Sequence, residues 1–102
     1  MVQMLDDKAD SIALMCRKHR VARLYVFGSV LREGFRPGES DVDLLVEFEA
    51  MDGYSRAEAY FDMLEELEGL LGTRVDLVMA GAVKNRFVAA DIERAKEMLY
   101  SA

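Results

Sequence analysis

Two aspartates separated by one residue interrupt a strand that is otherwise apolar, and this feature constrains the fold more than any other. They are Asp41 and Asp43 in "DVDLLVEF", residues 41–48. Because the side chains of a strand alternate between its two faces, both carboxylates point to one face and the two valines to the other. The apolar run at residues 44–46 indicates that both faces are covered farther along. We therefore expect a sheet with a covered face on each side.

The segments before this strand predict a helix and another strand. "RLYVFG", residues 23–28, is an aromatic and β-branched run that a glycine ends, which is typical of a strand. Residues 29–34 fit a short helix, and the glycines and the single proline of residues 33–40 predict a turn. Residues 4–20 read as an amphipathic helix. Its apolar positions recur at steps of three and four: Leu5, Ala9, Ile12 and Cys16.

The segments after it predict two helices and one strand. Ser55 and Glu58 form a capping-box pattern at the start of a helix that ends near residues 69–72. "TRVDLVMAG", residues 73–81, predicts a strand that again carries an aspartate, Asp76. Residues 84–100 predict a last helix. Its apolar stripe would be Val88, Ile92, Ala95 and Leu99.

The order of these elements predicts an α/β (α+β) fold in which helices flank a small mixed sheet. No internal repeat or linker divides the 102 residues, so we expect one domain spanning residues 1–102. Neither a membrane span nor a signal peptide is visible, and we expect a cytoplasmic protein that binds no membrane.

Composition limits the binding partners. A net charge of −6 argues against an extended nucleic-acid surface, which would show as a basic stripe. The densest basic stretch, residues 17–23, falls at a predicted helix end and reads as a solvated terminus or a partner-facing patch. With only Cys16 and His19 available, the chain cannot build a His/Cys zinc site. Any metal must therefore be held by oxygen atoms.

The aspartates are the strongest candidates for chemistry. Asp41 and Asp43 lie on one strand face about 7 Å apart, where two like charges repel unless a cation lies between them. Mg²⁺ suits such a site because it prefers oxygen ligands and leaves positions for water and phosphate. If the strand of Asp76 is a neighbour, a third carboxylate joins them, as two-metal phosphoryl transfer requires. The alternative is that Asp41 and Asp43 merely form a solvated strand start.

The strand that ends at Gly28 supplies the complementary half of a phosphate site. Glycine lets the backbone turn sharply and approach a ligand, and the amides that follow can donate to phosphate. Ser29 adds a hydroxyl. Arg32 and Arg36 lie in the loop between this turn and the carboxylates, either as ligands of triphosphate oxygens or as solvated charges.

The span "GSVLREGFRPGESDVDL" resembles the Gly-Ser, loop, Asp-x-Asp signature of the DNA polymerase beta-like nucleotidyltransferase superfamily. Small size and a leading helix resemble its minimal branch, the MntA-like antitoxins. The resemblance implies that Gly28, Ser29 and Arg32 bind the nucleotide and that Asp41, Asp43 and Asp76 bind magnesium, with two ions expected. It also implies that Asp76 helps deprotonate the attacking hydroxyl. The loop between Ser29 and Asp41 is one residue longer than is usual in this branch.

The resemblance implies an enzyme that transfers AMP from ATP to a tyrosine of a partner HEPN-domain toxin and so acts as its antitoxin. No residues remain for an acceptor domain, so we expect the acceptor to dock from outside. Two alternatives stay open. The chain could neutralise its toxin by stoichiometric binding without catalysis, or it could transfer a nucleotide to a small molecule such as an aminoglycoside.

Overall fold

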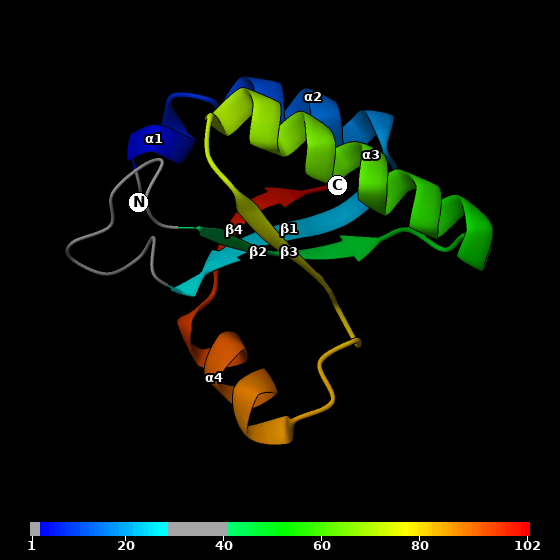
Figure 1. Cartoon of the computed structure of the whole chain (residues 1–102), viewed down its shortest axis with the longest axis vertical. Helices are drawn as coiled ribbons and strands as arrows, with labels where there is room; N and C mark the ends of the chain where they lie inside the picture. The colour runs from blue at the N-terminus through cyan, green and yellow to red at the C-terminus, as the bar shows by residue number, and fades with distance from the viewer. Residues whose placement is uncertain (1–2, 29–40) are drawn as a thin grey trace.

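The computed structural model describes residues 3–28 and 41–102, which form a four-stranded sheet between two layers of helices (Figure 1). Helices α1 to α3 cover one face of the sheet, and α4 lies against the other. The elements follow in this order: α1 (Gln3–Asp6), α2 (Ala9–Lys18), β1 (Val21–Phe27), β2 (Val42–Phe48), α3 (Gly53–Leu71), β3 (Val75–Met79), α4 (Arg86–Ala95) and β4 (Glu97–Ser101). The predicted mixed sheet with flanking helices is confirmed.

The sheet has the strand order β3-β2-β1-β4. β1 pairs antiparallel with both β2 and β4, whereas β2 and β3 are parallel and are joined by the crossover helix α3. The two strands that carry aspartates are thus neighbours. Val42 pairs with Val75 and Leu44 with Leu77, so the two strands run in register from their first residues.

The main core lies between the sheet and helices α2 and α3. All of its buried residues are apolar, and its largest side chains are fully buried. The alternation predicted for residues 41–48 is confirmed, because β2 turns its valines, Leu44 and Phe48 to this core and Leu45 to the α4 side. Cys16 also belongs to the core, where burial raises the pKa of its thiol to about 12. A smaller cluster on the opposite face contains Tyr25, Leu45 and Ile92.

The start of α3 differs from the capping box predicted from Ser55. Asp52 is the N-cap, and its Oδ1 accepts a hydrogen bond from the backbone N–H of Ser55 at 2.8 Å. Ser55 also donates its hydroxyl to the second carboxylate oxygen. The helix therefore begins three residues earlier than the capping box indicated, because aspartate caps a helix as well as serine does. It ends at Gly72, in the left-handed region at φ 67°.

The Asp52 cap makes the stability of the protein depend on pH. Hydrogen bonds from Ser55 hold the pKa of Asp52 below its ordinary 3.8, so the cap stabilises the fold above that value and is lost as pH falls through the lower, folded-state pKa. We expect Asp52→Ala to lower the Tm at pH 7 by a few degrees and to have less effect at acid pH. Asp52→Asn is the matched control, because asparagine keeps the acceptor without the charge. A pH-independent Asp52→Ala effect would contradict this account.

The predicted helix over residues 84–100 is wrong in its last third. α4 stops at Ala95, Lys96 is extended, and Glu97–Ser101 forms the edge strand β4. β4 pairs with β1, and the N–H of Ala102 continues the ladder to the carbonyl of Ala22. Leu99 thus lies on a strand, although its spacing from Ile92 and Ala95 also fits the apolar stripe of a helix. Pairing with a strand more than 70 residues away in sequence is invisible to local periodicity.

The first predicted helix is divided into α1 and α2 by a turn, and the basic stretch that follows is largely engaged within the protein. Lys18 Nζ lies 2.6 Å from Glu66 Oε1 on α3, and His19 contacts the other oxygen of that carboxylate. These two partners, Lys18 first, hold the pKa of Glu66 below its ordinary value. Arg23 pairs with Glu47 at 3.1 Å.

Within the described residues, no helix is long and apolar enough to cross a membrane.

Candidate active site

Asp43 and Asp76 lie directly beside each other on the sheet. They are register partners on the parallel strands β2 and β3, so their side chains leave the same face from adjacent strands. That face is the α4 side, because Leu45 and Val78, each two residues farther along, belong to the cluster beneath α4. Asp43 is half-buried, whereas Asp76 is exposed. The sequence predicted this pairing on condition that the strands were neighbours, and they are.

Asp41 stands just before β2 and is exposed. Its Oδ1 lies 3.4 Å from Nε of Arg74, the residue that precedes β3. The adjoining backbone is held by a hydrogen bond from the N–H of Val42 to the carbonyl of Arg74. Arg74 was not a candidate in the sequence. Its position immediately before a strand that carries an aspartate is the only signal that could have identified it.

Gly28 packs against the Asp43 carboxylate at the end of β1. Its φ of +76° lies in the left-handed region, which glycine adopts without strain. A Cβ added there would overlap the Asp43 carboxylate, with the Cγ of Asp43 only 2.9 Å away. Phe27 is the register partner of Asp43, which explains why the next residue meets that side chain. The sequence singled out Gly28 for approach to a ligand, and its nearest side chain in the protein is a predicted metal ligand.

Four of the predicted site residues are placed by these contacts, and three candidates are not. Asp43, Asp76 and Gly28 come together at one end of the sheet, with Asp41 at the adjoining strand start. Ser29, Arg32 and Arg36 lie outside the described residues, so their predicted contacts with phosphate stay predictions.

The donor set at this end of the sheet suits a hard cation. Asp43 and Asp76 present carboxylate oxygens from adjacent positions, and magnesium prefers such ligands while leaving sites for water and phosphate. Within residues 3–28 and 41–102, however, no three His, Cys, Asp or Glu side chains are gathered closely enough to hold a metal together. The described site is therefore a carboxylate pair with a third carboxylate, Asp41, turned to an arginine.

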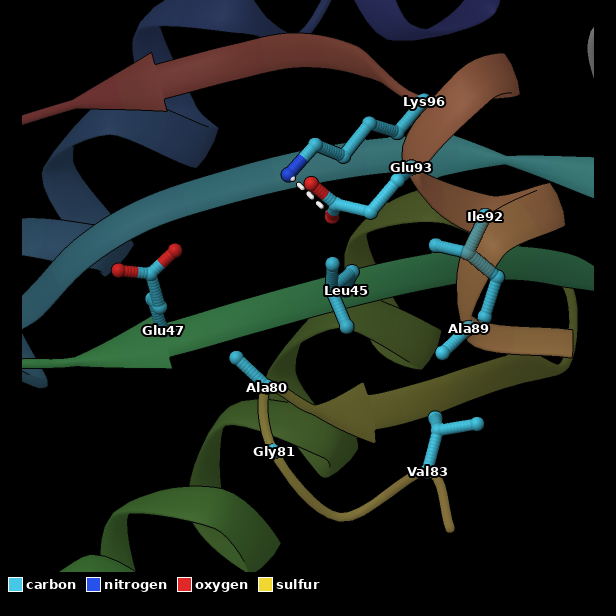
Figure 2. A pocket seen from close by; sticks show the side chains of 9 residues that line it. All are labelled: Leu45, Glu47, Ala80, Gly81, Val83, Ala89, Ile92, Glu93 and Lys96. Carbon is cyan, nitrogen blue, oxygen red and sulfur yellow. Dashed lines mark ion pairs between the residues drawn. The ribbon is translucent and has the colours of Figure 1, made fainter. Parts of the chain in front are cut away.

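A hollow of about 160 Å³ lies on the same face of the sheet, beside α4 (Figure 2). Leu45 and Ile92 contribute apolar walls, and Glu93 and Lys96 form an ion pair at 2.7 Å on its edge. Lys96 Nζ also lies 4.0 Å from the centre of the Tyr25 ring. The hydrogen bond to Glu93 raises the pKa of Lys96 above its ordinary value. These contacts fix the C-terminal end of α4 against the sheet.

The mixed sheet carries a carboxylate pair next to a glycine turn, as the sequence predicted for a nucleotidyl-transfer site, and comparison with known proteins identifies the family. A family model described as "Nucleotidyltransferase domain" matches residues 11–99. The chain belongs to this family and is a nucleotidyltransferase. The match begins within α2 and ends within β4, so it includes β1, β2 and β3 in full and the first part of β4.

Curated relatives lie within the same group. A Methanocaldococcus jannaschii protein with the provisional name protein adenylyltransferase MJ0128 is 34% identical over 87 residues, which cover 85% of this chain and 83% of the relative. Protein adenylyltransferase MntA of Thermococcus cleftensis is 43% identical over 65 residues, 64% of this chain and 62% of the relative. The resemblance to MntA-like minimal nucleotidyltransferases is thus confirmed.

Solved structures agree with the fold. A chain described provisionally as a minimal nucleotidyltransferase is 32% identical with a TM-score of 0.68, and the match covers 94% of this chain and 93% of that one. A chain in the structure of a tri-AMPylated Shewanella oneidensis HEPN toxin in complex with MNT antitoxin matches with a TM-score of 0.65. The match covers 96% of this chain and 73% of that chain. Because the identity is only 19%, this second match shows similarity of fold alone.

Proposed function

We propose that the chain transfers AMP from ATP to a tyrosine hydroxyl of a HEPN-domain toxin, in a Mg²⁺-dependent reaction, and thereby acts as its antitoxin. The observation that carries the proposal is the parallel register of Asp43 with Asp76 beside Gly28. The relatives named protein adenylyltransferase support AMP as the transferred group. The neighbouring complex of an MNT antitoxin with an AMPylated HEPN toxin supports the class of partner.

Each residue of the site has its own role in the proposed reaction. The acceptor oxygen forms a bond to the α-phosphorus of ATP, the bond from that phosphorus to the bridging oxygen breaks, and pyrophosphate leaves. The exposed Asp76 carboxylate takes the proton of the acceptor hydroxyl, which can approach from solvent. The half-buried Asp43 would hold Mg²⁺ together with Asp76 and Asp41. Because Gly28 has no side chain, it leaves room for the Asp43 carboxylate. When bound, the metal neutralises charge that develops on the phosphates.

Mass spectrometry of the toxin tests the proposal. A purified HEPN-domain toxin is incubated with the chain, ATP and MgCl₂, and we expect its mass to increase by one or more AMP units on a tyrosine peptide. EDTA should abolish the increase, because without a divalent cation the negative carboxylates repel the negative triphosphate. A toxin of unchanged mass whose ribonuclease activity is nevertheless blocked would instead favour inhibition by binding alone.

A further inference from the structure

Phe87 and Val88, at the start of α4, are apolar and yet exposed, with 78% and 47% of their surface accessible. The sequence pattern placed Val88 in the buried stripe of this helix together with Ile92. In the structure Ile92 is the buried residue of α4, and Val88 turns to solvent beside Phe87. We call these two residues, with the adjoining Lys84 and Arg86, the α4 surface. Adjacent exposed apolar side chains of this kind are typical of contact sites.

The two apolar residues are held in place before any partner arrives. The Oδ1 of Asn85 accepts hydrogen bonds from the backbone N–H groups of Phe87 at 2.9 Å and Val88 at 3.3 Å. Asn85 is thus the N-cap that fixes the first turn of the helix. A surface that is already ordered loses less conformational entropy when a partner binds.

The α4 surface lies on the side of the sheet from which the carboxylates can be reached. Asp43 and Asp76 point to the face that α4 covers, whereas α2 and α3 cover the other (Figure 1). Exposed aromatic residues also occur on α3, namely Tyr54 and Phe61. A protein seated on α3 would have the sheet between its hydroxyl and the carboxylates. A protein docked on the α4 side has no sheet between its hydroxyl and the carboxylates.

Charge indicates what kind of surface fits. Lys84 and Arg86 form no ion pair with any residue in the described ranges, whereas Arg94 at the end of α4 and Lys96 just after it are paired with Asp91 and Glu93. The chain as a whole carries a net charge of −6, so most of its surface repels an acidic protein. The α4 surface combines these two cations, which have no ion-pair partner among the described residues, with two exposed apolar side chains.

From these observations we infer that the α4 surface docks the protein that carries the acceptor hydroxyl, through an apolar recess with an acidic rim on that partner. The inference rests on the proposed function for the identity of the partner. Phe87 fills the recess, as buried aromatic anchors do at protein interfaces, and the cations set orientation and the rate of encounter. Docking on this side of the sheet brings the acceptor to the face that carries the exposed Asp76.

The test measures binding separately from catalysis. The dissociation constant of the full chain for the same HEPN-domain toxin is determined by calorimetry without ATP. Phe87→Ala should raise this constant about tenfold or more, because an aromatic anchor is lost. Tyr54→Ala is the matched control, since Tyr54 is also 78% exposed but lies on the opposite face, and it should leave the constant unchanged. Circular dichroism checks that both variants are folded.

Charge reversal supplies a second, independent readout. Lys84→Glu combined with Arg86→Glu should weaken binding several-fold at low salt and progressively less as ionic strength rises, because the cations act through screened electrostatics. Arg56→Glu, an exposed change on α3, should have a smaller effect. A salt-independent loss would show that the change acts by unfolding or by packing, and it would overturn the assignment of the charges.

Three outcomes overturn the docking assignment. One is a wild-type dissociation constant for Phe87→Ala, and another is equal weakening by Tyr54→Ala. The third is that Phe87→Ala separates copies of this chain in sedimentation experiments while partner binding is retained, which would make the α4 surface a self-association site. If the wild-type chain binds the toxin through α4 but adds no AMP, the docking inference stands and the proposed catalytic function fails.

Discussion

Asp43→Asn is expected to lower the rate of AMP transfer about a thousandfold while the protein stays folded. Asp43 is the carboxylate at which β1, β2 and β3 meet, because it pairs with Phe27 on one side and with Asp76 on the other. The amide keeps the shape of the side chain but removes the negative charge that would hold the metal. The rate is measured with ATP labelled at the α-phosphate and excess HEPN toxin.

Glu47→Gln is the matched control for this substitution. It makes the same carboxylate-to-amide change on the same strand and the same face, four residues farther along, where Glu47 pairs with Arg23. That ion pair is partly exposed, so its loss should cost little stability and leave transfer within about twofold. If the two variants lose activity equally, the carboxylate pair is not the site of reaction.

Gly28→Ala should lower transfer about a hundredfold by displacing the Asp43 carboxylate. The new methyl group would lie 2.9 Å from the Asp43 Cγ, and the half-buried carboxylate must move to accommodate it. A shift of about 1 Å in a reacting geometry can reduce a rate to this extent. The left-handed backbone adds strain of about 1 kcal/mol, so the free energy of unfolding should also fall.

Gly72→Ala separates the strain from the displacement. Gly72 has a similar φ of +67°, but a Cβ there meets no atom within 4 Å. Both alanine variants should therefore lose comparable stability in urea, and only Gly28→Ala should lose catalysis. Equal transfer rates for the two variants would mean that the contact between Gly28 and Asp43 has no role in the reaction.

What could be predicted from the sequence was set by local periodicity. The alternation in residues 41–48 placed Asp43 on the face opposite the core, and the same rule applied to Asp76 put both on one face once their strands were parallel neighbours. Strand adjacency itself is a property of the whole fold. It entered the sequence argument only as a condition, and the crossover through α3 fulfils it.

The parts that sequence patterns missed depend on contacts between distant segments. β4 was predicted as the end of a helix because its partner, β1, lies far away along the chain. Val88 was placed in a buried stripe because periodicity cannot tell how much of a short helix the sheet can cover. Asn85 could have been recognised as a cap by its residue type, and Arg74 pairs with Asp41 only because β2 and β3 begin side by side.

The central claim is that the chain acts on its toxin catalytically, and a titration with the toxin in tenfold molar excess tests it most directly. With ATP and Mg²⁺, the account predicts that intact-mass spectra show AMP on essentially all of the toxin, because each copy of the chain turns over many times. Toxin that stays unmodified, and is inhibited only up to one equivalent of the chain, would contradict it.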